Sequence, residues 1–340
     1  MRRTAALAAA ILTLGLAGIA PAVSGAVGPI ELNIGSIAPE NSPWSDMLHK
    51  IEAQIEADSH GQIQVNVRPA GMMAEVELVR EVRDGSRLQG CGVTTAALAQ
   101  GGNVPILQLV ELPYLFENTS EADYLLDNVL FKPFSEALGR RGFVLGMWSE
   151  NGWRSFGTKG RPIHKPEDLK GLKMRSQESN VHMAMYAAFG ATAVQKPMNE
   201  VQTALQSGAI DGIDTTALYT LAAGLADPLD DFTLTRHIYQ PAAIVFSKAW
   251  FDKLSPDLQD VVRAPRTHTF EGRRVIRSEE AGVLAMFPNM GLNVIELTPE
   301  ERDAFRAKGR AMHGPFVAGI EGGPEIYAKI NTALKSLRGQ

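Results

Sequence analysis

The sequence predicts an α/β fold with two domains, and three observations lead to this prediction. Residues 31–95 read as strand, helix, strand, helix and strand, which is half of a doubly wound sheet. Residues 171–216 read as a second unit, with strand, helix, short strand, helix and strand in that order. The chain has 340 residues, which exceeds the usual size of a single hydrophobic core.

The first 26 residues are expected to lie outside this fold, because they have the three parts of a secretory signal peptide. Arg2 and Arg3 form a positive start, residues 5–20 are almost entirely apolar, and Ser24-Gly25-Ala26 offers the small residues of a cleavage site. A membrane anchor is the alternative, but the apolar run is shorter than the roughly 20 residues that a span needs. We therefore predict export with cleavage after Ala26.

Composition excludes several kinds of partner and chemistry. The formal net charge is −5, and it becomes −7 once Arg2 and Arg3 are removed, so nothing favours binding to nucleic acid or anionic lipid. Cys91 is the single cysteine and is expected to be a small buried hydrophobe. None of the common nucleophile, phosphate-loop, dinucleotide or zinc motifs occurs, and the seven histidines have no metal-ligand spacing. We therefore expect no metal, no cofactor and no catalytic residues.

Local signals define the elements of the first unit. Residues 31–37 alternate apolar and polar side chains, as a half-buried strand does. Ser42 is a typical N-cap and Pro43 a typical first helical residue, so a helix should run to about Ala57. The other elements expected here are a strand at 62–67, a helix at 75–83 that ends at Asp84-Gly85, and a strand at 88–95.

The middle of the chain is expected to connect the two domains. Gly152, Gly157 and Gly160 loosen the chain and favour a crossover there. Before them we expect a loop at 101–115, helices at 119–128 and 132–138, and a strand at 143–149. After them we expect a strand at 172–175, a helix at 179–189 and a strand at 210–215. Asn199 should cap the helix before that last strand, with Gln202 as its capping partner and Gly208 just past its end.

A helical pattern from Pro256 to about Met286, with a break at Pro265, is the main feature of the C-terminal part. Such a helix would be up to roughly 45 Å long, which suits a link between two lobes better than a cover for one sheet. The other elements expected here are strands at 240–247 and 292–297 and helices at 248–253, 299–308 and 324–337.

Polar side chains at strand ends point to a binding site. Arg175 ends one predicted strand, and Thr215 with Thr216 ends another. Open α/β sheets bind ligands at the carboxyl ends of their strands, so these residues predict a pocket built around an anion. The run Asn151-Gly152-Trp153-Arg154 follows the strand at 143–149, and two arginines can clamp one carboxylate with charge-assisted hydrogen bonds. A surface salt bridge is the alternative for Arg154.

Aromatic side chains can form the walls of this pocket. Trp44, Trp153 and Tyr219 are the candidates, and a place in the core is the alternative for each of them.

Several segments resemble the solute-binding proteins of tripartite ATP-independent periplasmic (TRAP) transporters, of the dicarboxylate-binding type. The order and spacing of these segments match over essentially the whole mature chain. The segments are Ser42-Pro43-Trp44, Pro69-Ala70-Gly71, Leu112-Pro113-Tyr114-Leu115-Phe116, Gly171-Leu172-Lys173-Met174-Arg175, residues 200–208 with Asp211-Gly212, and Ser247-Lys248-Ala249-Trp250-Phe251.

The resemblance implies a type II-like periplasmic binding fold with two lobes, each a mixed sheet flanked by helices, and a long helix that spans both. It implies a first lobe of residues 27–151 plus 240–279 and a second lobe of residues 152–239 plus 280–340. Such proteins close on an organic acid in the periplasm and deliver it to a membrane permease. Most of them act as monomers, and we expect a monomer here.

The resemblance also assigns roles to residues. Arg175 would bind the ligand carboxylate, with Arg154 as a second arginine of the cleft. Thr215 stands where many members carry Asn, and Met198 stands where many carry Phe. The candidate ligand-binding residues are Arg175, Arg154, Thr215, Trp44, Glu75, Thr94, Thr95, Asn151, Trp153, Gln177, Met198, Thr216 and Tyr219.

Two departures from the family pattern leave the ligand open. The chain reads Ile-Asp-Thr-Thr at 213–216, where many members read Gln-Glu-Asn-Pro, and Ser-Gln-Glu at 176–178, where many read Val-Pro. Keto, hydroxy, sugar and aromatic acids all remain candidates. A secreted enzyme that uses Glu178 as a base and a periplasmic sensing module are the alternative functions.

Overall fold

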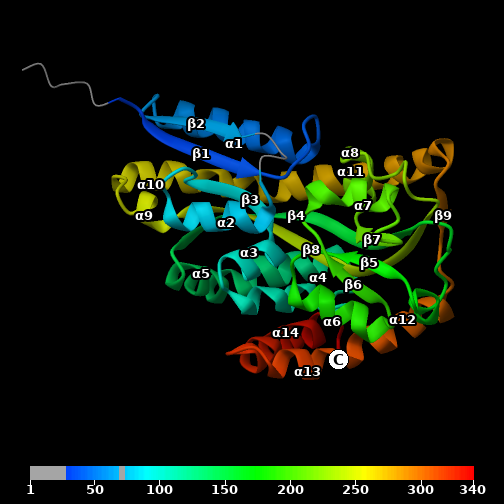
Figure 1. Ribbon diagram of the computed structural model, residues 1–340. Coiled ribbons are helices and arrows are strands. Elements are labelled where there is room, and N and C mark those ends of the chain that lie inside the picture. Colours follow the sequence, from blue (N-terminus) through cyan, green and yellow to red (C-terminus); the bar gives the residue numbers. More distant parts are fainter. Residues whose placement is uncertain (1–27, 69–72) are drawn as a thin grey trace, which may run out of the picture.

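The structure is a computed structural model, and it describes residues 28–68 and 73–340. The predicted signal peptide and the segment Pro69-Ala70-Gly71 lie outside the described residues. Nine strands form one mixed sheet within the described part of the chain. Their order is β2-β1-β3-β8-β4-β7-β5-β6, with β9 paired to β8 (Figure 1).

The first unit folds as the sequence predicts. Its elements are β1 (Ile30–Ser36), α1 (Pro43–Asp58), β2 (Ile63–Arg68), α2 (Glu75–Asp84) and β3 (Gly90–Thr94). Strand β1 lies between β2 and β3 and is parallel to both. Ser42 caps α1 by accepting a hydrogen bond from the Ser45 amide at 3.4 Å, and Pro43 opens the helix, as expected.

The segment after β3 is more ordered than the sequence suggests. Thr94 caps a short helix, α3 (Thr95–Gly101), and the expected loop at 101–115 contains the 3-10 helix η1 (Pro105–Glu111). Helices α4 (Thr119–Tyr124), η2 (Leu125–Leu130) and α5 (Phe131–Arg140) follow. Helices α3 and η1 are mostly buried, so they lack the amphipathic pattern that marks a surface helix, whereas the helices expected at 119–128 and 132–138 are confirmed.

Two long antiparallel strands, β4 (Phe143–Thr158) and β8 (Asp231–Ser247), run through both halves of the sheet. The sequence predicted shorter strands at 143–149 and 240–247 and a crossover at the glycines, and this prediction was wrong. The polar residues of the missed half-strands, such as Arg154 and Thr233, are buried and therefore broke the expected apolar alternation. Gly152, with φ of 108°, sits beside a bulge in β4 instead of at a chain crossover.

The second unit contains β5 (Lys173–Ser176), α6 (Asn180–Phe189), β6 (Thr192–Gln195), α7 (Val201–Gln206), β7 (Gly212–Thr215) and α8 (Ala217–Ala222). Strand β5 is parallel to β6 and β7, and β7 is antiparallel to β4. A 3-10 helix, η3 (Pro166–Leu169), precedes this unit. Asn199 does not cap α7, because it lies inside the 3-10 turn η4 (Met198–Glu200) that leads into the helix.

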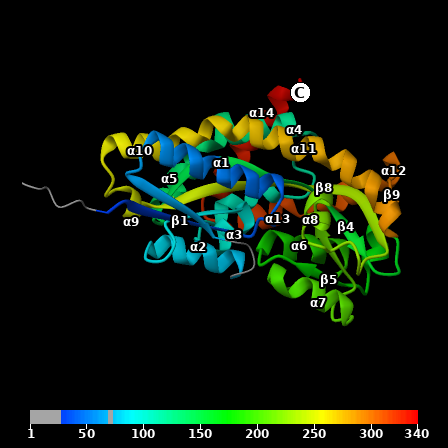
Figure 2. The same cartoon turned by 90° about the horizontal axis from the view of Figure 1, so that it is seen from above.

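The long helix of the C-terminal part is confirmed, with its break at the expected place. Helix α10 (Pro256–Arg263), the 3-10 helix η5 (Ala264–His268) and helix α11 (Thr269–Met286) follow one another along one side of the molecule (Figure 2). Helix α11 packs against both α1 and α8, so it contacts both lobes. The remaining elements are α9 (Lys248–Phe251), η6 (Phe287–Met290), β9 (Asn293–Ile295), α12 (Pro299–Ala311), α13 (His313–Ala318) and α14 (Gly323–Leu337).

The C-terminal helices divide between the two lobes. Phe305 of α12 packs with Phe189 of α6 in the second lobe, at a centroid distance of 5.4 Å. Ile330 of α14 is instead buried in the same cluster as Leu126 of the first lobe. By packing, α12 therefore lies against the second unit and α14 against the core of the first.

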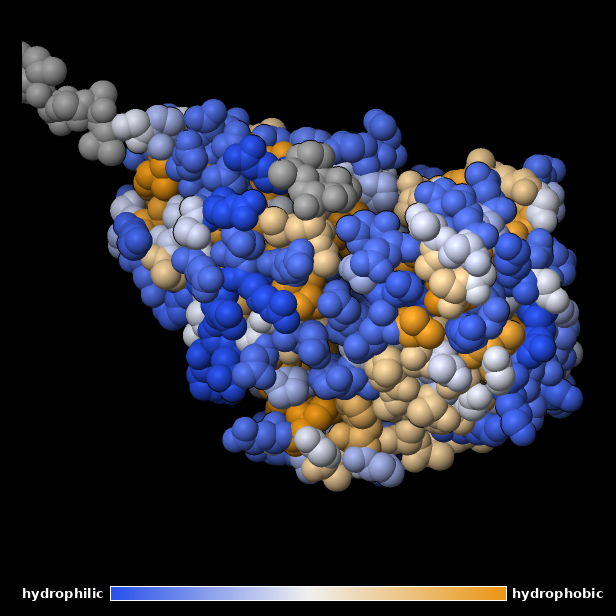
Figure 3. Space-filling model, viewed as in Figure 1, coloured by the Kyte–Doolittle hydropathy of each residue, from blue (hydrophilic) through white to orange (hydrophobic). Residues whose placement is uncertain are grey.

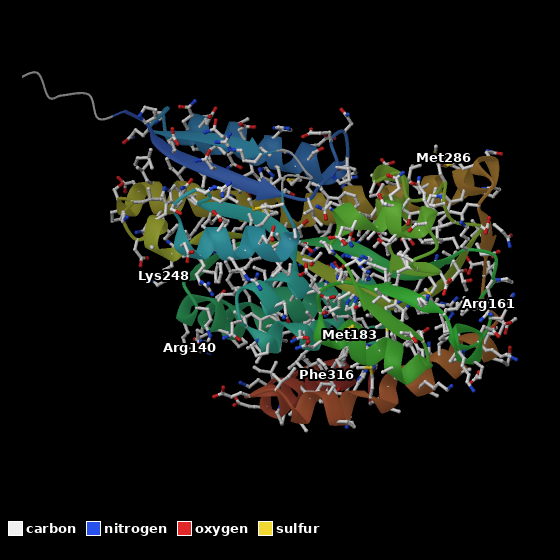
Figure 4. The ribbon with its side chains drawn as sticks, viewed as in Figure 1. Arg140, Arg161, Met183, Lys248, Met286 and Phe316 are labelled. Carbon is white, nitrogen blue, oxygen red and sulfur yellow. The ribbon has the colours of Figure 1, made fainter. Side chains whose placement is uncertain are left out.

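The surface near α6 and α13 is the most apolar part of the face shown in Figure 3. Met183 of α6 and Phe316 of α13 lie there, one above the other in the view of Figure 4. Both side chains are partly buried. Among the helices of the described residues, none is long and apolar enough to cross a membrane.

Candidate functional site

A cavity with an empty volume of about 780 Å³ lies between the two lobes. Trp44 and Glu75 line it from the first lobe, and Thr215 and Tyr219 line it from the second. A smaller neighbouring cavity of about 330 Å³ shares Glu75 and includes Arg175. The carboxyl ends of β5 and β7 therefore face this space, as the sequence predicted for an open α/β sheet.

Direct contacts between the lobes enclose the cavity. The rings of Trp44 and Tyr219 lie 5.9 Å apart between centroids. The Tyr219 hydroxyl donates a hydrogen bond of 3.4 Å to the carbonyl of Ile37, and Gln177 Nε2 donates one of 3.4 Å to Glu75 Oε2. The structure is therefore a closed form, in which side chains of both lobes line the same cavity.

Arg175 is a buried cation with no ion-pair partner in the described part of the chain. Its side chain is 3% exposed, and its Nε donates to the carbonyl of Lys196 at 2.9 Å. Its Nη1 has no hydrogen-bond partner among the described residues. Burial, and then the nearby charge of Arg154, lower the pKa of Arg175. Because an arginine pKa begins far above neutral, the group stays charged and favours an anion beside it.

Thr215 lies on the same face of the sheet as Arg175. Ile213 is the partner of Arg175 in the β5–β7 pair, and Thr215 follows two residues later on β7. The Thr215 hydroxyl is buried and also lacks a hydrogen-bond partner within the described residues. Buried polar groups are rarely left without partners. The hydroxyl of Thr215 and Nη1 of Arg175 are thus two buried polar groups, on one face of the sheet and at two adjoining cavities, that lack partners in the described chain.

Arg154 lines the same cavity, but its guanidinium is already bonded. Its Nε donates to Asp214 Oδ2 at 2.6 Å, its Nη1 donates to Gln240 Oε1 at 2.7 Å, and its Nη2 donates to the carbonyl of Asp214. Burial acts to raise the pKa of Asp214, but the Arg154 charge and nearby His237 outweigh it and hold that pKa well below its usual range. Arg154 therefore does form a salt bridge, but this salt bridge is buried and does not lie on the surface, as the alternative had supposed.

Glu75 contacts both lobes at the end of the main cavity that adjoins Arg175, called the anchor end below. Its carboxylate accepts hydrogen bonds from the Thr94 amide at 2.6 Å and the Thr94 hydroxyl at 3.0 Å. Burial raises the pKa of Glu75 to about 7, although the two bonds from Thr94 oppose this effect. Gln177 is held in place by Gln240, whose Nε2 donates to Gln177 Oε1 at 2.7 Å.

The positions of the other candidates also follow from the fold. Asn151 and Met198 line the main cavity, and Asn151 Nδ2 donates to Gln240 Oε1 at 2.8 Å. The bulge at Glu150 and Gly152 turns this part of β4 so that Asn151 faces the cavity. Trp44 is fixed as a wall because its Nε1 donates to the carbonyl of Glu150 at 2.8 Å.

Besides Arg175, three candidates do not line the main cavity. The Thr95 hydroxyl donates to Glu111 Oε1 at 2.5 Å in the protein interior. Trp153 packs on Tyr239 with centroids 5.4 Å apart. Thr216 caps α8 by accepting a hydrogen bond from the Tyr219 amide at 3.2 Å. Trp153 and Thr216 line a separate cavity of about 520 Å³ on the other side of Asn151.

Sequence reasoning missed a buried polar network beneath the site. Gln240 Nε2 donates to Glu111 Oε2 at 2.8 Å, and His182 Nε2 lies 2.7 Å from the same carboxylate atom. His182 is fully buried, and its Nδ1 has no hydrogen-bond partner within the described residues. These residues are far apart in the sequence, so no local spacing pointed to the network.

Sequence reasoning also missed an apolar end of the main cavity. Met47 and Leu48 of α1 line it, together with Ile276 of α11. A signal for this end was present, because Met47 and Leu48 follow Trp44 at the spacing of one helix face.

The residues of the described ranges, 28–68 and 73–340, include no group of three or more His, Cys, Asp or Glu side chains arranged to hold a metal ion. Cys91 is buried and free, in the expected strand.

Comparison with known proteins identifies the family. The family model for bacterial extracellular solute-binding proteins, family 7, matches residues 34–318. The chain belongs to this family. A relative from Verminephrobacter eiseniae, a solute-binding protein, is 30% identical over 278 residues, which are 81% of each chain.

Two solved structures extend the comparison of this family 7 protein. The sugar acid binding protein DctPAm from Advenella mimigardefordensis, in complex with galactonate, has a TM-score of 0.85 and 25% identity over 91% of this chain and 99% of its own. A TRAP periplasmic solute-binding protein from Polaromonas, bound to D-erythronate, has a TM-score of 0.83 and 26% identity over 88% and 98%. The resemblance to TRAP solute-binding proteins and the two-lobed α/β fold are confirmed.

Proposed function

We propose that this family 7 protein captures an organic acid by its carboxylate and that Arg175 is the group that binds it. The observation that carries the proposal is a buried cation, Arg175, whose Nη1 has no partner in the described chain and which lines the smaller cavity, on the same sheet face as the unpartnered hydroxyl of Thr215 in the adjoining main cavity. A carboxylate satisfies both groups at once. Galactonate and D-erythronate, which two of the similar proteins hold, each carry one carboxylate.

Binding and closure are coupled in this proposal. Trp44 and Glu75 contact the ligand from the first lobe, and Arg175 and Thr215 contact it from the second. Both sets of contacts exist in the closed form alone, so a ligand shifts the protein toward closure by its differential affinity. Hydrogen bonds to a charged group contribute about 1.5–3 kcal/mol each, and micromolar affinity corresponds to about −8 kcal/mol. Two such bonds with apolar burial are enough for micromolar binding.

The role of the other candidates follows from their present contacts. Thr94, Gln177, Asn151, Met198 and Tyr219 complete the cavity wall. Arg154 adds positive charge at the cavity and holds Asp214 and Gln240 in place. Thr95, Trp153 and Thr216 support the wall from behind.

We also propose that the mature chain works in the periplasm, as a monomer, without cofactor or nucleic acid, and delivers its ligand to TRAP permease subunits. It is not an enzyme in this proposal. Glu178 lines the smaller cavity, but no histidine or other group in the described chain bonds to its side chain to orient it as a base. A bound acid should therefore be recovered unchanged after long incubation, and a changed product would favour the enzyme alternative.

A thermal-shift panel of sodium carboxylates tests the carboxylate assignment. A ligand that binds the folded state raises the apparent stability by RT ln(1 + [L]/Kd), so a binding acid at 100 times its Kd adds about 2.7 kcal/mol. The matched control for each acid is its primary amide, which has the same shape and no charge. We expect shifts with acids and none with amides. Equal shifts for an acid and its amide would contradict the role of Arg175.

A further inference from the structure

The main cavity changes character with distance from Arg175. Near Arg175 it contains polar groups, namely Glu75 and Gln177, which line both cavities. At the other end it lies under α1 and α11 and is lined by Met47, Leu48, Ile244, Gly272 and Ile276. Leu48, Ile244 and Ile276 are at most 5% exposed. A ligand held by Arg175 that fills the cavity therefore places its far end against apolar side chains.

The polar side chains that line the main cavity are mostly bonded to the protein. The Ser36 hydroxyl donates to the carbonyl of Gly92 and accepts from the Ala38 amide. Trp44, Asn151 and Tyr219 also have protein partners. Apart from Thr215 at the anchor end, Ser149 is the lining residue of the described chain whose hydroxyl has no protein hydrogen bond.

This arrangement disfavours ligands with many polar groups. Each hydroxyl that leaves water needs a new partner, or its burial weakens binding. The cavity offers such partners near Glu75 and Gln177 and at Ser149, and few elsewhere. A second carboxylate in the main cavity would meet the positive charge of Arg154, but three of the five N–H groups of this guanidinium already bond Asp214 and Gln240, so few of its donors remain for a ligand.

We infer that the preferred ligand is a monocarboxylate with an apolar, branched or aromatic body that carries at most one oxygen substituent. This inference rests on the proposed function, because Arg175 must hold the carboxylate. It also separates this chain from the two similar proteins that hold galactonate and D-erythronate, whose bodies carry several hydroxyls.

Gly272 sets the depth of the apolar end. A Cβ atom at this position of α11 would lie 3.3 Å from Met47 Cε, which is closer than normal side-chain contacts. Glycine therefore leaves space between α1 and α11. The side chain of any other residue here would reduce the cavity or displace Met47. Gly282 of the same helix has open space around its position and is a matched control for the effect of alanine on the helix.

Isothermal titration of the mature chain tests the inference with five acids. Phenylacetate and 4-methylpentanoate represent apolar bodies, galactonate and D-erythronate represent polyhydroxylated bodies, and succinate represents a dicarboxylate. We expect one of the apolar acids to bind at least tenfold more tightly than the other three. If galactonate, D-erythronate or succinate binds most tightly, the inference is wrong and the proposed function stands. If no acid binds and carboxylates cause no thermal shift, both are wrong.

Variants locate the apolar body. Gly272→Ala should weaken the tightest apolar acid at least fivefold and change the affinity for butyrate, which is shorter, by less than twofold. Gly282→Ala should change neither affinity. Met47→Gln, which places an amide at the apolar end, should weaken the same acid at least fivefold. Unchanged affinity in both Gly272→Ala and Met47→Gln would show that the ligand does not reach this end and would overturn the inference.

Discussion

Replacing each of the two buried arginines with methionine should separate the one that binds ligand from the one that supports the fold. Arg154 and Arg175 are 1% and 3% exposed, so both side chains are removed from the same kind of environment. Methionine keeps much of the apolar stem and removes the charge. The two variants therefore differ mainly in what the guanidinium was bonded to.

The structure predicts that the two variants differ in the stability of the unliganded protein. Loss of Arg154 leaves Asp214 buried without its ion-pair partner at 2.6 Å, and such a loss costs about 3–5 kcal/mol. Loss of Arg175 removes one bond, from Nε to the carbonyl of Lys196, which is worth about 1.5–3 kcal/mol. It also removes a buried cation that has no partner carboxylate, so the desolvation cost that disappears offsets that bond. Arg175→Met should therefore change the free energy of unfolding by less than about 1 kcal/mol.

Arg175→Met should instead affect binding. Arg175→Met removes the proposed contact to the carboxylate, and the loss of even one charge-assisted bond of about 1.5–3 kcal/mol weakens binding tenfold or more. Urea unfolding without ligand measures the first quantity, and isothermal titration with the tightest acid of the panel measures the second. If Arg175→Met destabilises the unliganded protein as much as Arg154→Met does and leaves affinity unchanged, Arg175 is a structural residue and the reasoning fails.

Further predictions concern four other residues of the site and its surroundings. Burial raises the pKa of Glu75 to about 7, above its value in the unfolded chain, so its contribution to stability is full at low pH and is lost as the pH rises through 7. In urea unfolding, the free energy of unfolding of Glu75→Gln should therefore rise by about 1–3 kcal/mol relative to that of the parent between pH 5 and pH 8. Equal dependence of the two unfolding free energies on pH would contradict this. Thr215→Val should leave stability unchanged and weaken ligand binding about three- to tenfold, because the hydroxyl has no protein partner. Thr95→Val should instead lower stability by about 1–3 kcal/mol, because it leaves the buried Glu111 carboxylate with one bond fewer. Tyr219→Phe should change affinity less than twofold, because the hydroxyl bond is long at 3.4 Å, whereas Tyr219→Ala removes the wall against Trp44 and should cost at least tenfold in a titration.

Elements with strong local signals could be predicted from the sequence, and they position most of the site. The cap at Ser42, the alternation of β1 and the break at Pro265 are all visible in a few neighbouring residues. The second half of β4 could not be predicted, because its buried polar residues, including Arg154, are satisfied by partners from distant strands. Periodicity cannot show such partners.

The same limit applies to the site. Arg175 and Thr215 lie at the ends of predicted strands, so their place at one sheet edge could be predicted. The sequence alone gave the two arginines the same task. Their difference depends on Asp214, which lies on the neighbouring strand β7 and takes up the guanidinium of Arg154. Whether a buried arginine is paired within the protein or free to bind a ligand therefore depends on tertiary contacts, which the local spacing of residues does not reveal.

The unpaired cation also bears on which conformation the empty protein prefers. In the closed form Arg175 is buried beside the charge of Arg154, and no carboxylate of the described chain pairs with it. Opening the lobes returns Arg175 to water and removes this cost, so the empty protein should favour the open form. A ligand reverses the preference by the difference between its affinities for the two forms, and a shift from 1:99 to 99:1 requires about 10⁴-fold, or about 5.5 kcal/mol. Two charge-assisted bonds at about 1.5–3 kcal/mol each supply an energy of that size. Arg175 therefore holds the ligand and makes closure depend on it, and X-ray scattering of Arg175→Met without ligand should show a more compact molecule than the parent.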